Sequence, residues 1–148
     1  MELQAVYTFD APVSRVWDAL MDIEAIGRCL PGCGGLRPVG DDRYEAELVA
    51  AVAAVSGSFK ATVAIEDRQP PHTYRLVTEA TGRPGFVRGH ARMSLAPDGS
   101  GTRVEVNASA DVGGTIARVG QRLLEGVARM MLDRFFACMA SRIGRSGG

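Results

Sequence analysis

The sequence has no excess charge of either sign and no long hydrophobic run. Its 148 residues carry 17 lysines and arginines against 17 aspartates and glutamates, so the formal net charge is zero. A neutral chain lacks the broad basic field of nucleic-acid-binding domains, so we expect no nucleic-acid partner. No apolar run approaches the roughly 20 residues of a membrane-spanning helix. We therefore expect one globular domain over residues 1–148.

Cysteine and histidine are also scarce. An odd, small number of cysteines (Cys29, Cys33 and Cys138), without a secretion leader before them, predicts reduced thiols in the cytoplasm. The two histidines fall in an expected turn and on an expected solvent-facing strand. They complete neither a Ser-His-acid or Cys-His set nor a four-ligand zinc site. We expect no catalytic residue, no metal and no covalent cofactor, and therefore no enzyme.

Alternating apolar and polar residues predict a series of strands. They span residues 2–9, 43–53, 57–67, 73–81, 86–96 and 101–112, with a short strand near 36–40. Asp, Gly, Pro and Ser separate most of them in short turns, and strands joined this way pair antiparallel. Two short helices, from about residue 13 and over 22–28, follow the first strand.

One face of this sheet is predicted to be apolar and the other polar, as in a sheet covered on one side. The covered face is rich in small residues: Ala46, Ala50, Ala61, Gly89, Ala91, Ala108 and Ala110. Small inward side chains leave space unless large residues opposite fill it. No carboxylate is expected on this face, which argues against general acid–base chemistry there.

A long helix over residues 115–143 is predicted to cover the sheet. Its first half carries an apolar stripe: Ile116, Val119, Gly120, Leu123, Leu124, Val127, Met130 and Met131. Gly120 on that stripe either allows close packing or widens a pocket.

The second half of this helix carries another apolar stripe, roughly on the back of the first: Leu132, Phe136, Met139 and Ile143. The helix is also basic, with six arginines (the last Arg145) against two acidic residues, a net charge of about four (6 minus 2). A basic amphipathic helix suits an anionic membrane surface, here the inner face, or a partner protein. Membrane contact and a homodimer through this stripe are equal alternatives.

Several motifs together resemble one known family. They are Phe9-Asp10-Ala11-Pro12 with Val16-Trp17-Asp18-Ala19-Leu20, Cys29-Leu30-Pro31-Gly32-Cys33, Gly85-Phe86-Val87-Arg88-Gly89, and Val112-Gly113-Gly114-Thr115-Ile116-Ala117 with Val119-Gly120. Over nearly its whole length the chain resembles the carbon monoxide dehydrogenase CoxG family of the START-like (SRPBCC) superfamily. The resemblance implies an α+β helix-grip fold, a curved antiparallel sheet of six to seven strands around a long C-terminal helix.

The resemblance also implies a function. The family is associated with binding an isoprenoid quinone, such as menaquinone, in a hydrophobic cavity between sheet and helix, as an accessory or carrier for a molybdenum-containing carbon monoxide dehydrogenase. The alternatives are a cyclase- or hydroxylase-like enzyme, and an assembly factor acting by protein contact alone. The candidate ligand-binding residues are Trp17, Leu20, Leu30, Pro31, Tyr44, Leu48, Phe59, Val63, Tyr74, Phe86, Val87, Met93, Val106, Ile116, Gly120, Leu123, Leu124, Val127 and Met131.

Overall fold

The computed structural model describes the backbone of residues 1–52 and 55–147 and the side chains of residues 1–50 and 56–143. The elements in chain order are β1 (Glu2–Phe9), α1 (Val13–Leu20), α2 (Ile23–Cys29), β2 (Arg37–Gly40), β3 (Arg43–Val52), β4 (Val55–Gln69), β5 (Thr73–Gly82), β6 (Gly85–Asp98), β7 (Gly101–Gly113), the 3-10 helix η1 (Thr115–Val119) and α3 (Gln121–Gly147). The predicted strands and the two short helices are confirmed. Residue 53, the last of the predicted strand 43–53, lies outside the described residues.

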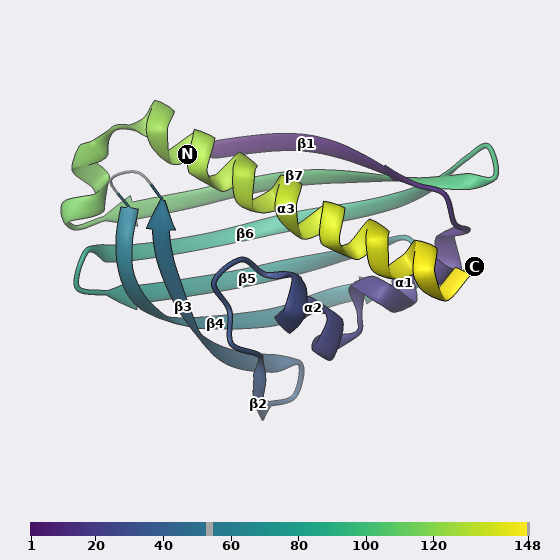
Figure 1. Ribbon diagram of the computed structural model, residues 1–148, viewed down its shortest axis with the longest axis horizontal. Coiled ribbons are helices and arrows are strands. Elements are labelled where there is room, and N and C mark those ends of the chain that lie inside the picture. The colour runs from purple at the N-terminus through teal and green to yellow at the C-terminus, as the bar shows by residue number, and fades with distance from the viewer. Residues whose placement is uncertain (53–54, 148) are drawn as a thin grey trace.

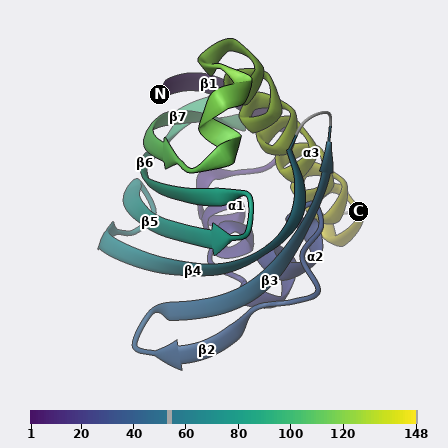
Figure 2. The same cartoon turned by 90° about the vertical axis from the view of Figure 1, so that its left-hand side faces the viewer.

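The strands form one antiparallel sheet in the order β1-β7-β6-β5-β4-β3-β2. All neighbours except β1 and β7 follow each other in the chain, as the short turns predict. The sheet curls, and α3 crosses its concave side diagonally (Figures 1 and 2). The predicted helix-grip architecture is confirmed.

The predicted continuous helix from residue 115 is interrupted. Thr115–Val119 form the short η1, and α3 begins only at Gln121. Between them Gly120 has φ of +98°, a conformation that favours glycine over residues with a Cβ. Gly120 is also exposed. It therefore ends one helix and starts the next, and neither packs against the sheet nor widens a pocket.

The main core lies beneath the C-terminal half of α3. Phe136, Met139 and Ile143 are 2%, 0% and 5% exposed, and Leu132 packs against the same cluster. They are covered because α3 lies against β1, α1 and α2 there. The prediction that this stripe serves a membrane or a homodimer is therefore wrong. Arg145, one of the six arginines in the predicted basic charge of the helix, lies outside the residues whose side chains are described.

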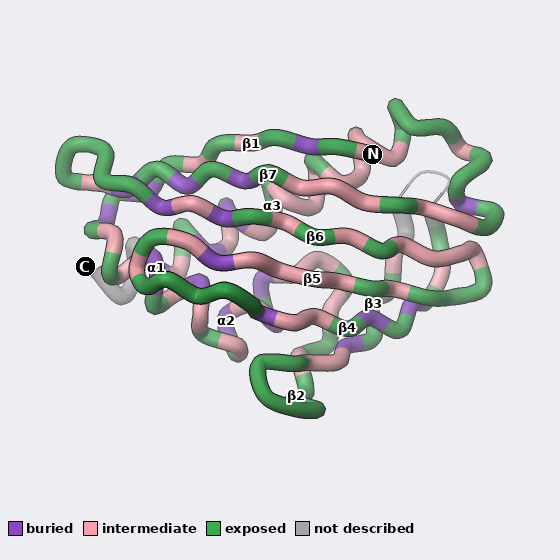
Figure 3. The backbone as a smooth tube through the Cα atoms, turned by 180° about the vertical axis from the view of Figure 1, so that it is seen from behind, coloured by how far each residue is buried: buried purple, intermediate pink, exposed green. Residues whose placement is uncertain are grey.

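The convex face of the sheet carries the polar positions, and its strands are mostly exposed or half-buried (Figure 3). Among the described residues no helix is both long and apolar enough to cross a bilayer.

Candidate ligand-binding site

The middle of the concave face is built from small side chains. Strand register aligns three neighbouring lines across it: Ala46-Ala61-Ala80-Val87-Val112, Tyr44-Val63-Thr78-Gly89-Ala110 and Ile65-Leu76-Ala91-Ala108-Leu3. The central members are only half-buried: Thr78, Ala80, Gly89, Ala91, Ala108 and Ala110. In a filled core such residues would be fully covered. The centre of the concave face is therefore less tightly covered than the packed clusters at its two ends.

Both ends of this open region are packed. At one end the main core contains five predicted site residues: Trp17, Leu20, Tyr74, Met93 and Val106. At the other end Phe59 and Ile116 form a second buried cluster. The predicted residues that pack around that pair, only partly buried, are Leu48, Val87, Leu124 and Val127. The sheet centre lies between two apolar clusters, and α3 passes over both.

The remaining predicted site residues divide into two groups. Five are half-buried: Leu30, Pro31, Tyr44, Val63 and Met131. Three lie away from the concave face. The ring of Phe86 lies 5.1 Å from the guanidinium of Arg88, which places it on the convex side, because residues 86 and 88 share one face of β6. Gly120 is exposed, and Leu123 is 39% exposed on the outer side of α3.

Tyr74 is a buried polar group at the edge of the open region. It is 4% exposed, and burial raises the pKa of its hydroxyl well above the usual value. Its ring meets Trp17 edge-on, with centroids 5.3 Å apart. The hydroxyl forms no hydrogen bond with the described residues. Because this oxygen is not among the fully buried unpaired atoms of the described residues, the hydroxyl is an accessible donor.

Tyr7 is already engaged. Its hydroxyl donates to Asp133 Oδ1 at 2.7 Å, and its ring stacks on Phe136 with centroids 4.2 Å apart. Burial and the Asp133 carboxylate together raise the pKa of Tyr7. Arg129 Nη2 donates to the carbonyl of Gln4 at 3.2 Å, one turn earlier on α3. Tyr7 therefore holds α3 against β1 and is not available to a ligand.

One carboxylate of α3, that of Glu125, is half-buried. Glu125 precedes Leu132 by seven residues and Met139 by fourteen, so all three lie on nearly the same side of α3. Glu125 is half-buried and accepts a hydrogen bond of 3.1 Å from Gln121 Nε2. At that end of α3 the residues that pack toward the sheet are Leu124 and Val127, on a different side of the helix, so the prediction that no carboxylate lies on the covered face stays a prediction.

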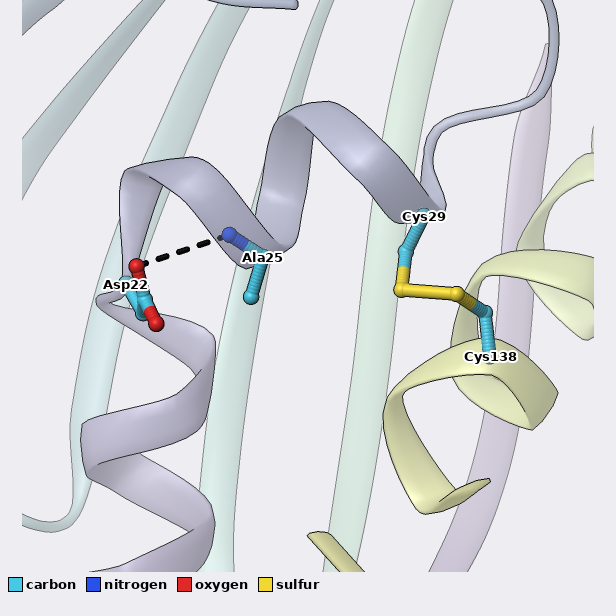
Figure 4. The surroundings of a disulfide bond; sticks show 4 residues. All are labelled: Asp22, Ala25, Cys29 and Cys138. Atoms are coloured by element: carbon cyan, nitrogen blue, oxygen red, sulfur yellow. Dashed lines mark hydrogen bonds between the residues drawn. A yellow bond between two sulfur atoms is a disulfide. The ribbon is translucent and has the colours of Figure 1, made fainter. Parts of the chain in front are cut away.

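The cysteines also differ from the prediction of reduced thiols. Cys29 and Cys138 form a disulfide between the end of α2 and the middle of α3 (Figure 4). Cys33 is free and half-buried, and its Sγ accepts a hydrogen bond from the Gly35 amide at 3.4 Å. Because 109 residues separate the bonded cysteines, only tertiary structure brings them together. The disulfide attaches the end of α2 to the helix that covers the sheet.

Comparison with known proteins identifies the family. Residues 8–144 match the model of the CoxG family of carbon monoxide dehydrogenase subunits. The chain belongs to the CoxG family. No curated protein matches it. Among solved structures, a conserved protein from Geobacillus kaustophilus is 34% identical with a TM-score of 0.96, the match covering 99% of this chain and 97% of that one.

More distant solved structures share the fold of this CoxG-family chain. A START superfamily protein from Mycobacterium smegmatis is 14% identical, with a TM-score of 0.76 and 97% of each chain covered. The ZhuI aromatase/cyclase from Streptomyces sp. R1128 is 14% identical, with a TM-score of 0.72 and 100% and 96% of the two chains covered. At these identities the likeness establishes a START-like fold and does not establish an activity.

Proposed function

We propose that the protein binds an apolar small molecule, an isoprenoid quinone of the menaquinone kind, between the concave sheet face and α3. In this role it is a ligand-binding carrier rather than an enzyme. The observation that carries the proposal is the half-buried centre of the concave face, where Thr78, Gly89 and Ala110 lie in one line. Apolar surface left partly exposed between two packed clusters favours an apolar ligand.

The polar end of the ligand is assigned to Tyr74. Its hydroxyl has no partner among the described residues, and a quinone carbonyl is a hydrogen-bond acceptor. Tyr74 lies on the same face of β5 as Leu76 and Thr78, so one strand joins the hydroxyl to the open centre. An apolar site with one well-placed polar group is typical of small-molecule pockets.

Family membership supports the partner. The CoxG family is named for carbon monoxide dehydrogenase, so we propose that the protein supplies its ligand to a molybdenum-containing oxidoreductase of that type. The protein then acts as an accessory that shields a poorly soluble redox molecule from water.

The test uses the single tryptophan of the chain. Trp17 lies against Tyr74 with ring centroids 5.3 Å apart, so a quinone near Tyr74 quenches its fluorescence. Titration with a short-chain menaquinone should give saturable quenching, and native mass spectrometry should detect a co-purified lipid. If neither occurs, the proposed function is wrong.

A matched pair of variants locates the ligand. Ala91→Leu adds bulk at the concave centre, while Ala64→Leu adds the same bulk to a half-buried position on the convex face. Ala91→Leu should weaken menaquinone binding about tenfold or more, because the ligand must give up contacts of roughly 1–3 kcal/mol. Ala64→Leu should bind like the wild type. Equal weakening in both variants would place the ligand elsewhere.

Glu125 supports a second candidate, a cyclase-like enzyme. A half-buried carboxylate on α3 is the kind of group that general acid–base catalysis needs. Wild type and Glu125→Gln are compared for cyclisation of an open-chain precursor, the class of reaction named for the aromatase/cyclase of the same fold. Turnover that disappears in the variant would favour the enzyme, and binding without turnover in both proteins would favour the carrier.

A further inference from the structure

The convex face, opposite the proposed ligand site, carries a separate groove. Its volume is about 420 Å³, and it lies across β1, β7, β6 and β5, the strands that Figure 3 presents toward the viewer. Strand register aligns Arg75, Arg92, Asn107 and Gln4 in one line along it. His90, on the same face of β6, is two residues from Arg92. The groove is therefore lined mainly by hydrogen-bond donors.

The two arginines are directly opposite each other. Arg75 on β5 pairs with Arg92 on β6, and like charges in this position destabilise a sheet. The acidic residues near them on this face are Glu66, opposite Arg75 on β4, Glu105, two residues from Asn107 on β7, and Glu2 at the β1 side of the groove; Glu105 is bonded to Arg103. None of the ion pairs within the described part of the chain involves either arginine. Two cationic groups thus share one groove without a counter-charge bonded to them.

A second observation concerns the same groove. Arg75 Nε is buried and has no hydrogen-bond partner among the described residues. A buried N–H of a charged group without a partner is costly, and an unseen ion is one of the standard explanations. Guanidinium groups bind carboxylate and phosphate oxygens through two parallel hydrogen bonds.

We propose that this groove binds a small oxyanion, a carboxylate or a phosphate group, between the guanidinium groups of Arg75 and Arg92. The Asn107 amide lies next to Arg92 in the register and donates a further hydrogen bond. The anion separates the two positive charges and gives Arg75 Nε an acceptor. This site is on the other side of the sheet from the proposed quinone site and does not depend on it.

The test measures binding of inorganic phosphate and of acetate by thermal unfolding and calorimetry, with sodium chloride at matched ionic strength as the salt control. Wild type should show a saturable increase in melting temperature. Arg92→Gln, an exposed position, should weaken binding roughly tenfold or more, since it removes a charge-assisted pair. Arg88→Gln, four residues earlier on the same face of β6 and outside the groove, is the matched control and should bind normally.

A further arm separates a free anion from a lipid headgroup. Vesicles of phosphatidylglycerol are compared with vesicles of phosphatidylcholine, using wild type and Arg92→Gln. A response to free phosphate or acetate alone assigns the groove to a soluble anion, and a vesicle response that Arg92→Gln weakens assigns it to a headgroup. No saturable response in any arm, or the same response in Arg92→Gln as in wild type, overturns the proposal.

Discussion

The disulfide between α2 and α3 gives a quantitative prediction about stability. Reducing the Cys29–Cys138 bond should strongly destabilise the protein, because the bond closes a loop of 109 residues in the unfolded chain. Reduction breaks the crosslink without replacing any side chain. It is therefore the smallest perturbation that isolates the effect of the crosslink.

The magnitude follows from loop closure. For a loop of this length the chain-entropy relation gives about 4.8 kcal/mol at 25 °C. For a domain of this size each kcal/mol shifts the melting temperature by roughly 2–4 °C, so reduction should lower it by roughly 10–20 °C. This value is the effect of restraining the unfolded chain.

The assay compares urea unfolding of oxidised and reduced protein. Thiol titration under denaturing conditions should first find one free thiol, Cys33, and all three cysteines after reduction. Cys33→Ser is the matched control. It should leave both the unfolding midpoint and its sensitivity to reductant unchanged, because Cys33 forms no disulfide.

Two results would refute this reasoning. Three free thiols in the purified protein would mean that the bond does not form. A stability change below ~1 kcal/mol on reduction would mean that the crosslink restrains an already compact unfolded chain.

Three further predictions concern single side chains. Met139→Ala should lower the free energy of unfolding by about 2–5 kcal/mol in urea, because Met139 is 0% exposed. The control Leu123→Ala, at a 39% exposed position, should change it by no more than about 0.5 kcal/mol. Equal losses in the two variants would contradict the orientation of α3. Asp22→Ala should cost about 0.5–2 kcal/mol, since the Asp22 carboxylate caps α2 by accepting from the amides of Glu24 and Ala25; Asp22→Asn should retain most of this stability. Folding raises the pKa of the Tyr74 hydroxyl above its unfolded value of about 10. As the pH rises above that value, the unfolded chain loses the proton first, so the stability of the folded protein falls with pH. Tyr74→Phe should reduce this fall by about 1.4 kcal/mol per pH unit in alkaline urea titrations, and an unchanged slope would contradict the burial of the hydroxyl.

Local patterns in the sequence determined the sheet. Apolar residues alternate along each strand, and a period of two assigns faces without knowledge of the neighbours. The short turns then forced antiparallel neighbours, so β2 to β7 follow each other in space as in the chain. The apolar stripes predicted the long helix, and the family motifs predicted the membership that the match over residues 8–144 confirms.

The orientation of α3 was decided by tertiary structure. Both of its sides are apolar in part, so periodicity alone did not choose between Leu123 and Leu132. Contact with β1, α1 and α2 turned the stripe of Leu132 and Met139 inward in the C-terminal half, whereas Leu124 and Val127 face the second cluster in the N-terminal half. The helix also starts later than the pattern predicted, because Gly120 takes a positive φ.

The two candidate sites show the same division. The sequence determined that small residues share the concave face and that Arg75 and Arg92 lie on the convex one, since both follow from alternation along a strand. Only the folded sheet placed those arginines opposite each other, left Tyr74 without a described partner, and joined Cys29 to Cys138. The physical reason is that register and long-range contacts depend on how distant segments pack, whereas a face assignment depends only on residues two positions apart.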